Sequence, residues 1–122
     1  MIRRILIVDD DPDILLLLTR SLTLVGPDYQ LEVCQSGTEA LTLGQIRPFD
    51  LVISDYSMDD LNGLQLASKL KERQPELKVI LMSGNGYAGL AQKTAEAGLN
   101  GFISKPFKLA KVFETVRAVL EA

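Results

Sequence analysis

The chain contains no histidine, and Cys34 is its only cysteine. Without histidine, the usual zinc sites and the Ser/His or Cys/His pairs of nucleophilic catalysis cannot be built. A single cysteine cannot form an internal disulfide, and Cys34 is expected to be a small buried apolar side chain. Met58 and Met82 are likewise expected to be packing residues. These absences exclude several classes of enzyme before any motif is considered.

Long apolar runs and an excess of positive charge are also absent. The longest apolar run, residues 14–18, is far shorter than the about 20 residues of a membrane-spanning helix, and no signal peptide is expected. The 13 basic and 16 acidic residues give a net charge of −3. Because no positive field attracts phosphate backbones, direct binding to nucleic acid is not expected. The sequence therefore predicts a cytoplasmic protein without membrane insertion.

What the chain does contain is a regular alternation of short aliphatic runs and longer helical patterns. Its 122 residues and 47% hydrophobic content suit one compact domain over residues 1–122. The expected strands are residues 4–8, 31–34, 51–54, 79–82 and 101–104. The expected helices are residues 12–25, 36–46, 63–74, 90–97 and 109–120. This alternation predicts an α/β fold with a doubly wound, five-stranded parallel sheet.

Three of the expected helices begin with capping residues. Asp11 followed by Pro12 fits an N-cap and the first helical position, so Asp11 is expected to be structural. Ser36 and Glu39 have the spacing of a capping box, and Asn62 is a suitable N-cap for the third helix. These residues explain where the helices start, and they leave the polar residues directly after the strands to be explained.

Four of the five strands end in chemically distinctive residues. Asp9 and Asp10 follow the first strand, and Asp55 follows the third. Ser83 follows the fourth strand and Lys105 the fifth. In an open parallel sheet, sites form beyond the carboxyl ends of the strands, and right-handed crossovers bring these ends to one edge. The sequence therefore predicts one site that combines three carboxylates, a hydroxyl and an ammonium group.

The charges of this predicted site indicate a divalent cation. Three crowded carboxylates repel one another unless their pKa values rise or a cation is shared among them. Mg²⁺ suits a site with one or two carboxylates, a backbone carbonyl and water. Mg²⁺ and Lys105 together balance the charges of Asp9, Asp10 and Asp55. They would still largely offset a phosphoryl group on Asp55, which brings a charge of about −1.5 to −2.

Phosphoryl transfer depends mainly on positioning and on neutralising the phosphoryl oxygens, which gives three more residues a role. Ser83 can donate a hydrogen bond from its hydroxyl. Gly84 can donate from its backbone N–H, with no side chain in the way. The main-chain carbonyl of Ser57 lies near enough to Asp55 in sequence to be a further ligand of the metal.

Together, the segments VDDD, SDYSM, SGNG and GFISKPF resemble the receiver domain of two-component response regulators, of which the chemotaxis regulators are examples. The resemblance covers the whole chain and implies a flavodoxin-like (βα)5 fold with strand order 2-1-3-4-5. It implies that Asp9 and Asp10 bind Mg²⁺, and that Asp55 takes phosphate from a histidine kinase or a phosphotransfer protein. Ser83 and Lys105 complete the site. The domain would not be an enzyme beyond catalysing its own phosphorylation and dephosphorylation.

The resemblance also implies a switch. In the family, the hydroxyl residue, here Ser83, moves toward the phosphoryl group while an aromatic residue on the fifth strand, here Phe102, turns inward. The surface of the last two βα units then changes and controls binding to a downstream effector protein or domain. Homodimers through this face also occur in the family. Residues 1–122 leave no room for an output domain, and the sequence does not distinguish a single-domain regulator from a piece of a response regulator or hybrid kinase.

Three features depart from the common receiver pattern. Asp59 stands where many receivers have proline, and it adds a charge near the site. Phe102 replaces the frequent tyrosine and therefore lacks its hydroxyl. Gly84, Gly86 and Gly89 make the loop after Ser83 unusually free. In the family, the lifetime of the phosphorylated state depends partly on the positions that Ser57 and Asn85 occupy here.

Three alternative functions compete with the switch. Asp9 and Asp11 have the D-x-D spacing of haloacid dehalogenase-type phosphatases, with Asp9 as the nucleophile, but Asp13 stands where those enzymes usually have Thr or Val. A flavodoxin-like cofactor-binding module needs a first loop that attracts phosphate, and the aspartates after the first strand repel it. The third alternative is a receiver-shaped interaction module that is not phosphorylated, which Mg²⁺ binding would test.

Overall fold

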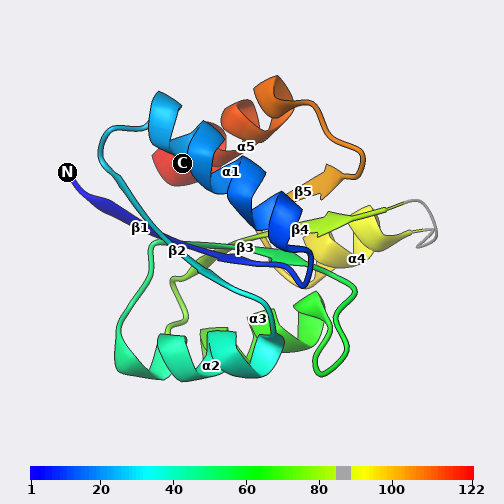
Figure 1. Ribbon diagram of the computed structural model, residues 1–122. Coiled ribbons are helices and arrows are strands. Elements are labelled where there is room, and N and C mark those ends of the chain that lie inside the picture. Colours follow the sequence, from blue (N-terminus) through cyan, green and yellow to red (C-terminus); the bar gives the residue numbers. More distant parts are fainter. Residues whose placement is uncertain (85–88) are drawn as a thin grey trace.

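The computed structural model describes residues 1–84 and 89–122, in which strands and helices alternate (Figure 1). The strands are β1 (Arg3–Val8), β2 (Tyr29–Cys34), β3 (Leu51–Asp55), β4 (Lys78–Ser83) and β5 (Gly101–Ser104). The helices are α1 (Pro12–Val25), α2 (Gly37–Ile46), α3 (Gly63–Arg73), α4 (Leu90–Glu96) and α5 (Leu109–Glu121). Every expected element is present, with boundaries within two residues of those predicted. Asn85 and Gly86, which the sequence singled out, lie outside the described residues.

The five strands form one parallel sheet in the order β2-β1-β3-β4-β5. Both the fold class and the strand order expected from the sequence are therefore confirmed. The register aligns the strand ends, because Val8 pairs with Ser54 and Asp55 pairs with Met82. Side chains that follow these strands must consequently lie at one edge of the sheet, here called the carboxyl edge.

Helices cover both faces of the sheet. Helices α1 and α5 lie on one face and α2 and α3 on the other, with α4 beside β5 (Figure 1). Alternate residues of β1 serve the two sides: Ile5 and Ile7 join the core under α1 and α5, whereas Leu6 and Val8 join the core over α2 and α3. All four are fully buried, which explains why a central parallel strand is aliphatic throughout.

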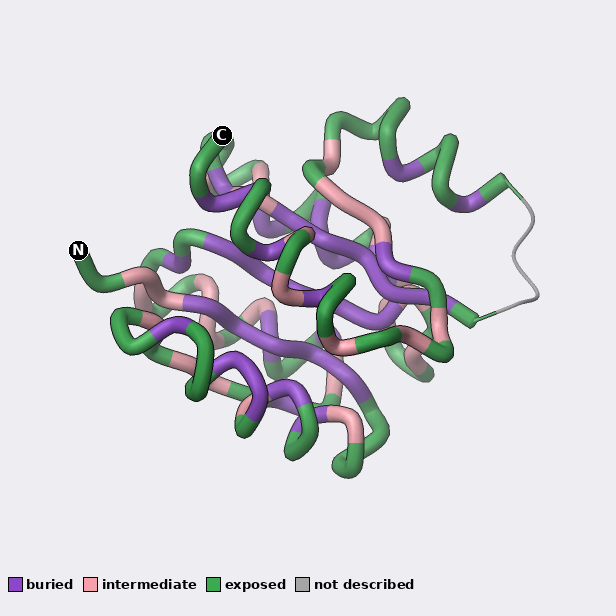
Figure 2. The backbone as a smooth tube through the Cα atoms, turned by 90° about the horizontal axis from the view of Figure 1, so that it is seen from above, coloured by how far each residue is buried: buried purple, intermediate pink, exposed green. Residues whose placement is uncertain are grey.

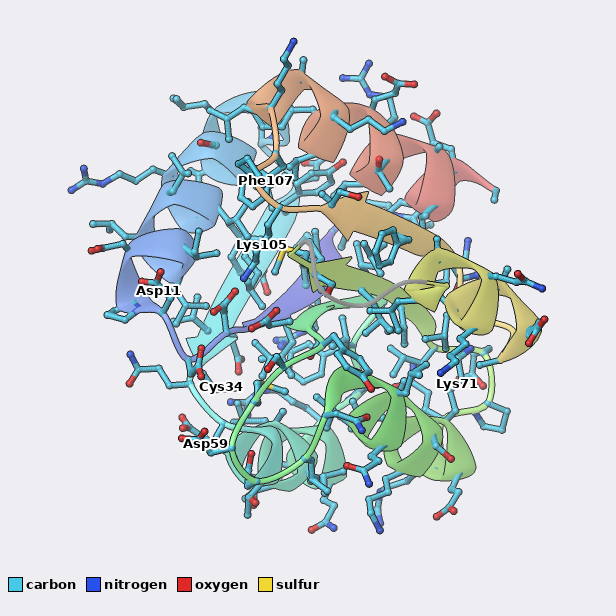
Figure 3. The ribbon with its side chains drawn as sticks, turned by 90° about the vertical axis from the view of Figure 1, so that its right-hand side faces the viewer. Asp11, Cys34, Asp59, Lys71, Lys105 and Phe107 are labelled. Carbon is cyan, nitrogen blue, oxygen red and sulfur yellow. The ribbon has the colours of Figure 1, made fainter. Side chains whose placement is uncertain are left out.

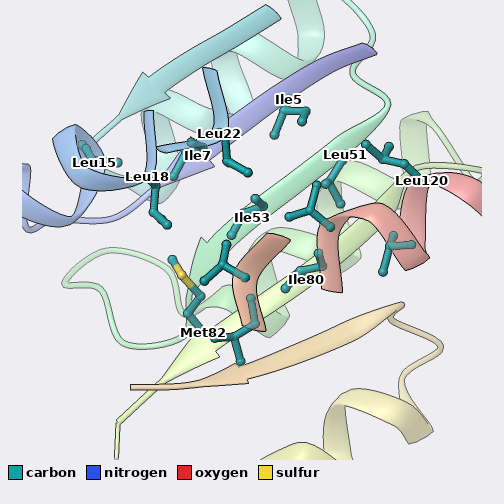
Figure 4. Close-up of a cluster of buried hydrophobic side chains, with 14 residues drawn as sticks. Ile5, Ile7, Leu15, Leu18, Leu22, Leu51, Ile53, Ile80, Met82 and Leu120 are labelled. Atoms are coloured by element: carbon teal, nitrogen blue, oxygen red, sulfur yellow. The ribbon is translucent and has the colours of Figure 1, made fainter. Parts of the chain in front are cut away.

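The core under α1 and α5 is a continuous apolar layer. Figure 4 shows Leu15, Leu18 and Leu22 of α1 facing the strands, at the spacing of one helical stripe. Leu18 and Leu22 have no solvent exposure, and neither does Met82 on β4. The tube in Figure 2 shows the result, with burial concentrated in the strands and exposure at the outer turns of the helices.

Helix α5 packs one apolar face against the sheet. Val112, Val116 and Leu120 are buried against the sheet, and Phe113 is partly buried at the border of that stripe. Val119 is buried as well. The apolar stripe of α5 therefore includes two consecutive residues, Val119 and Leu120.

The helix starts confirm the capping predictions with one difference. Asp11 accepts a hydrogen bond from the Asp13 N–H, and Ser36 accepts one from the Glu39 N–H. A complete capping box occurs at Asn62, whose side chain accepts from the Gln65 N–H while the Gln65 side chain accepts from the Asn62 N–H. The box was expected at Ser36 rather than at Asn62.

Cys34 is a buried packing residue, as predicted. Its side chain is 3% exposed, and burial raises the pKa of its thiol to about 12. At neutral pH it is therefore a thiol rather than a reactive thiolate. Met58 also packs partly against the core over α2 and α3. No helix within the described ranges has both the length and the apolar character needed to cross a membrane.

Candidate functional site

The predicted site residues meet at the carboxyl edge of the sheet. Strand β1 delivers Asp9 and Asp10, and β3 delivers Asp55 as its last residue. Strand β4 ends at Ser83, and Lys105 directly follows β5. Figure 3 looks onto this edge, and Lys105 extends from the end of β5 toward carboxylate oxygens near the middle of the edge. The structure thus brings together residues that are up to 96 positions apart.

Three carboxylates form the centre of the site, and we refer to Asp9, Asp10 and Asp55 as the acidic cluster. One oxygen from each lies within 4.8 Å of the others. Asp9 has no exposure and Asp55 is 7% exposed, whereas Asp10 faces solvent. Hard carboxylate oxygens in this number are ligands that suit a divalent cation such as Mg²⁺. The acidic cluster is therefore able to hold a metal ion.

Lys105 bridges two members of the acidic cluster. Its Nζ lies 2.9 Å from Asp9 Oδ2 and 3.3 Å from Asp55 Oδ1. Burial alone would lower the pKa of Lys105, but the hydrogen bond to Asp9 and the charges of Asp9 and Asp55 outweigh burial and raise it. The ammonium is therefore charged at neutral pH. Its backbone N–H also donates to the Ser83 carbonyl at 2.7 Å, which ties the end of β5 to β4.

Asp9 is held on both of its oxygens. Oδ1 accepts a hydrogen bond from the Asp11 N–H at 2.9 Å, and Oδ2 accepts one from Lys105. Asp11 itself caps α1, so its carboxylate serves the helix start and not the cluster. The phosphatase alternative, which combines a nucleophilic Asp9 with Asp11 in a D-x-D motif, does not match these contacts.

The ionised forms of the other two carboxylates, Asp55 and Asp10, are electrostatically disfavoured. Burial, followed by the negative charge of Asp9, raises the pKa of Asp55, although Lys105 acts in the opposite direction. Partial burial and the charges of Asp9 and Asp59 raise the pKa of Asp10. The charge of Asp59 thus acts on the site, as the sequence suggested. A bound divalent cation would favour the ionised forms and reverse these shifts.

Ser83 is the last residue of β4, the strand next to β3, and Gly84 follows it at the same edge. Ser83 is 1% exposed, and its hydroxyl donates to the Gly84 carbonyl at 3.3 Å. The hydroxyl must therefore rotate before it can donate to a group attached to Asp55. Gly84 is exposed, and no described atom lies within 4 Å of the place where its Cβ would be. Among the described residues, nothing therefore covers this position of the backbone.

The β3–α3 loop, residues 56–62, leads away from Asp55 and contains Ser57. It is fastened at both ends through Tyr56, whose N–H donates to the Met82 carbonyl and whose carbonyl accepts from the Gly63 N–H, each at 2.8 Å. A side chain at Gly63 would lie 2.8 Å from the Asp55 carbonyl oxygen, so only glycine fits this return of the chain. Ser57 is exposed in this loop, and its role as a metal ligand stays a prediction.

Phe102 occupies an intermediate position. It is partly buried and packs against the core over α2 and α3, next to Leu81 in the register of β4 and β5. The side chain is therefore neither fully inside nor fully in solvent. Its predicted part in switching stays a prediction.

Sequence reasoning gave no role to Asp60, yet its carboxylate accepts four hydrogen bonds near the site. It accepts from the Thr38 hydroxyl at 2.6 Å, the Thr38 N–H at 2.7 Å, the Leu61 N–H at 2.8 Å and the Gly37 N–H at 3.1 Å. Three of these donors belong to the start of α2, more than 20 residues earlier in the chain. No local sequence pattern signals a contact over that distance.

Comparisons with known proteins agree with this geometry. Residues 5–117 match the family described as the Response regulator receiver domain. The chain is 34% identical over 117 residues to the transcriptional regulatory protein GlrR of Escherichia coli (strain K12). This match covers 96% of this chain and 26% of GlrR. The chain therefore spans about a quarter of the length of that relative.

Solved structures of receiver domains have the same fold. A CheY-like response regulator receiver domain protein from Methanospirillum hungatei JF-1 matches with a TM-score of 0.90 and 28% identity over 99% of this chain and 95% of its own. The BeF3-activated DrrB receiver domain matches with a TM-score of 0.86 and 28% identity over the full length of both chains. From its strand order, its acidic cluster and the match over residues 5–117, the chain belongs to the receiver domains of two-component response regulators, which are signalling modules and not conventional enzymes.

Proposed function

We propose that Asp55 accepts a phosphoryl group from a histidine kinase or a histidine phosphotransfer protein. Mg²⁺ would be held by Asp9, Asp10 and Asp55 together with the main-chain carbonyl of Ser57. The observation that carries the proposal is the position of Asp55, which ends β3 within the acidic cluster and lies 3.3 Å from the Lys105 ammonium. Membership in the receiver family supports a histidine kinase as the class of partner.

The contacts of the two buried aspartates favour Asp55 over Asp9 as the acceptor. Asp9 has no exposure and is hydrogen-bonded on both oxygens, whereas Asp55 is 7% exposed at the end of its strand. An oxygen of Asp55 forms the new bond to phosphorus as the donor's bond to phosphorus breaks, and the donor keeps the electron pair. Lys105 is placed to stabilise the negative charge on the transferred group. A bound Mg²⁺ supplies further neutralisation of the phosphoryl oxygens.

The readout would be a change on the surface formed by α4, β5 and α5. Ser83 would turn its hydroxyl from the Gly84 carbonyl to a phosphoryl oxygen, and the backbone bond from Lys105 to Ser83 would carry the change to β5. Phe102 would move further inward from its half-buried position. A coupling of this kind typically changes an equilibrium about 5- to 150-fold, enough to control binding of a downstream effector or a second copy of the chain.

The direct test is modification by a small phosphoryl donor. Acetyl phosphate or beryllofluoride is added with and without Mg²⁺ to the wild type, Asp55→Asn and Asp9→Asn. Intact mass and amide spectral shifts are then measured. We expect modification of the wild type that requires Mg²⁺ and is absent in Asp55→Asn. Asp59→Asn serves as the matched control, because it removes a nearby charge without removing a proposed ligand.

The other outcomes separate the competing functions. Modification that survives in Asp55→Asn and disappears in Asp9→Asn would assign the acceptor to Asp9, as in the phosphatase alternative. If the wild type reacts under no condition, the domain is better described as an interaction module that is not phosphorylated. Either result would overturn the proposal.

A further inference from the structure

The carboxylate of Asp60 joins two loops at the carboxyl edge. Asp60 lies in the β3–α3 loop, and three of its four hydrogen bonds go to Gly37 and Thr38 in the first turn of α2. The loop that leaves β3 is therefore attached to α2, the helix that packs beside α3. The fourth bond, from the Leu61 N–H, fixes the carboxylate relative to its own backbone.

A second observation shows that the contact is close as well as polar. A Cβ placed on Gly37 would lie 2.8 Å from the Leu61 Cβ and 3.4 Å from Asp60 Oδ1. The absence of a side chain at Gly37 thus lets the β3–α3 loop approach the helix start. The same contact would be lost in two ways. Removal of the Asp60 carboxylate would eliminate the hydrogen bonds, and a side chain at Gly37 would push the loop away by steric overlap.

The electrostatics favour a permanent contact. The Thr38 hydroxyl, and then the Thr38 N–H, hold the pKa of Asp60 well below its ordinary value. The carboxylate is thus charged at any physiological pH, and a negative charge beside the first turn of a helix is favourable. The contact between Asp60 and the start of α2 is therefore kept at the neutral pH at which the acidic cluster would bind a cation.

We propose that Asp60 is a positioning residue for metal binding, which holds the β3–α3 loop and the Ser57 carbonyl against the acidic cluster. The inference rests on the proposed function, because it assumes that the cluster binds Mg²⁺. Ser57 follows Asp55 by two residues, and Tyr56 already fastens the start of the loop. Asp60 fastens its far half, so that the segment between the two attachments has few conformations left.

The test is calorimetric titration of Mg²⁺ into the wild type, Asp60→Ala and Gly37→Ala. Outer contacts of a metal site typically change affinity by about 10- to 100-fold, and we expect both variants to bind Mg²⁺ about 10-fold more weakly. Gly37→Ala keeps the charge of Asp60, so its effect cannot come from charge. Asp59→Ala gives the size of the effect of charge alone, and we expect a smaller loss of affinity.

Asp50→Ala is the matched control for a lost structural contact. The Asp50 carboxylate accepts a hydrogen bond from the Arg4 N–H at 2.8 Å, at the opposite edge of the sheet. Its removal should leave Mg²⁺ affinity unchanged. Hydrogen exchange of the β3–α3 loop is measured on the same samples, after circular dichroism has shown that each is folded, and we expect faster exchange in Asp60→Ala and Gly37→Ala.

The outcomes distinguish the two proposals. If the wild type does not bind Mg²⁺, the proposed function fails. If the wild type binds and Gly37→Ala binds equally well, or if Asp60→Ala loses no more affinity than Asp59→Ala, the positioning role is wrong while the proposed function stands. If Asp60→Ala does not fold, Gly37→Ala and Thr38→Val, which removes the shortest bond to Asp60, decide the question in the same way.

Discussion

The acidic cluster and the carboxylate of Asp60 lie at the same edge of the sheet, but their surroundings are opposite. In the acidic cluster, burial and mutual repulsion raise the pKa values of Asp55 and Asp10. At Asp60, hydrogen-bond donors lower the pKa of the carboxylate. The difference shows that neighbours, and not residue type, decide the role of an aspartate. Carboxylates that are crowded together are able to hold a cation, whereas a carboxylate surrounded by hydrogen-bond donors joins two parts of the chain.

The largest effect is expected when Lys105, the cation that contacts Asp9 and Asp55 in the protein itself, is removed. Lys105→Met leaves Asp9 buried without its ion-pair partner, and we expect the metal-free protein to lose about 2 kcal/mol of stability, less than for a fully buried pair because Lys105 is partly exposed. Urea unfolding measures the change. Mg²⁺ should restore part of the loss, and an unchanged midpoint without metal would show that the pair contributes nothing.

The structural side of the comparison is tested by Asp60→Ala. Loss of a side chain that satisfies helix N–H groups typically costs about 1 kcal/mol, and we expect that decrease in the free energy of unfolding. The neighbouring exposed Asp59→Ala is the control, with an expected change of no more than about 0.5 kcal/mol. Equal effects of the two substitutions would mean that the four hydrogen bonds of Asp60 do not stabilise the fold.

For the acidic cluster, we expect removal of a carboxylate to raise the free energy of unfolding, opposite to the effect of Asp60→Ala. Asp55→Asn removes a charge that the folded protein disfavours, so the metal-free variant should be more stable than the wild type by about 1 kcal/mol, the scale of one screened charge interaction. Thermal unfolding in a chelator measures this gain. With saturating Mg²⁺ the order should reverse, because only the wild type retains the full set of ligands. A variant less stable than the wild type in chelator would contradict the electrostatic account.

The raised pKa values of Asp55 and Asp10 and the lowered pKa of Asp60 affect the pH dependence of stability in opposite directions. A carboxyl with a raised pKa binds more protons in the folded than in the unfolded state between its two pKa values, so the contributions of Asp55 and Asp10 become more favourable as the pH falls through that interval. Asp60, with a lowered pKa, contributes stability that is present above about pH 4 and is lost at lower pH.

Urea midpoints measured in chelator from neutral pH downward test these signs. The metal-free wild type should gain stability in mildly acidic solution before losing it below about pH 4. Asp55→Asn should flatten the gain, and Asp60→Ala should weaken the loss. A wild type whose stability falls steadily from neutral pH would contradict the raised pKa values.

Much of this arrangement could be predicted from the sequence, because it depends on short-range patterns. The aliphatic runs located the strands, and the residues after them, such as Asp55 and Lys105, located the edge that carries the site. Asn62 was correctly predicted as the N-cap of α3, although the complete capping box that it forms with Gln65 was expected at Ser36 instead. Strand order followed from the resemblance to receivers and was confirmed by the pairing.

What could not be predicted depends on contacts between distant loops. Asp60 reaches Thr38 only because the β2-β1-β3 order brings the two loop regions to one edge, and exposed aspartates in loops are common. The sequence also did not indicate that Lys105 would lie closer to Asp9 than to Asp55. The half-buried position of Phe102 depends on packing against a core that no local pattern specifies.

Site mapping shows directly whether Asp55 is the phosphoryl acceptor. The wild type is incubated with acetyl phosphate and Mg²⁺, the acyl phosphate is trapped by reduction, and the modified residue is identified by peptide mass spectrometry. We expect modification at Asp55 alone, which is lost when Mg²⁺ is chelated. Modification at Asp9 or Asp10, or no modification with Mg²⁺ present, would contradict it.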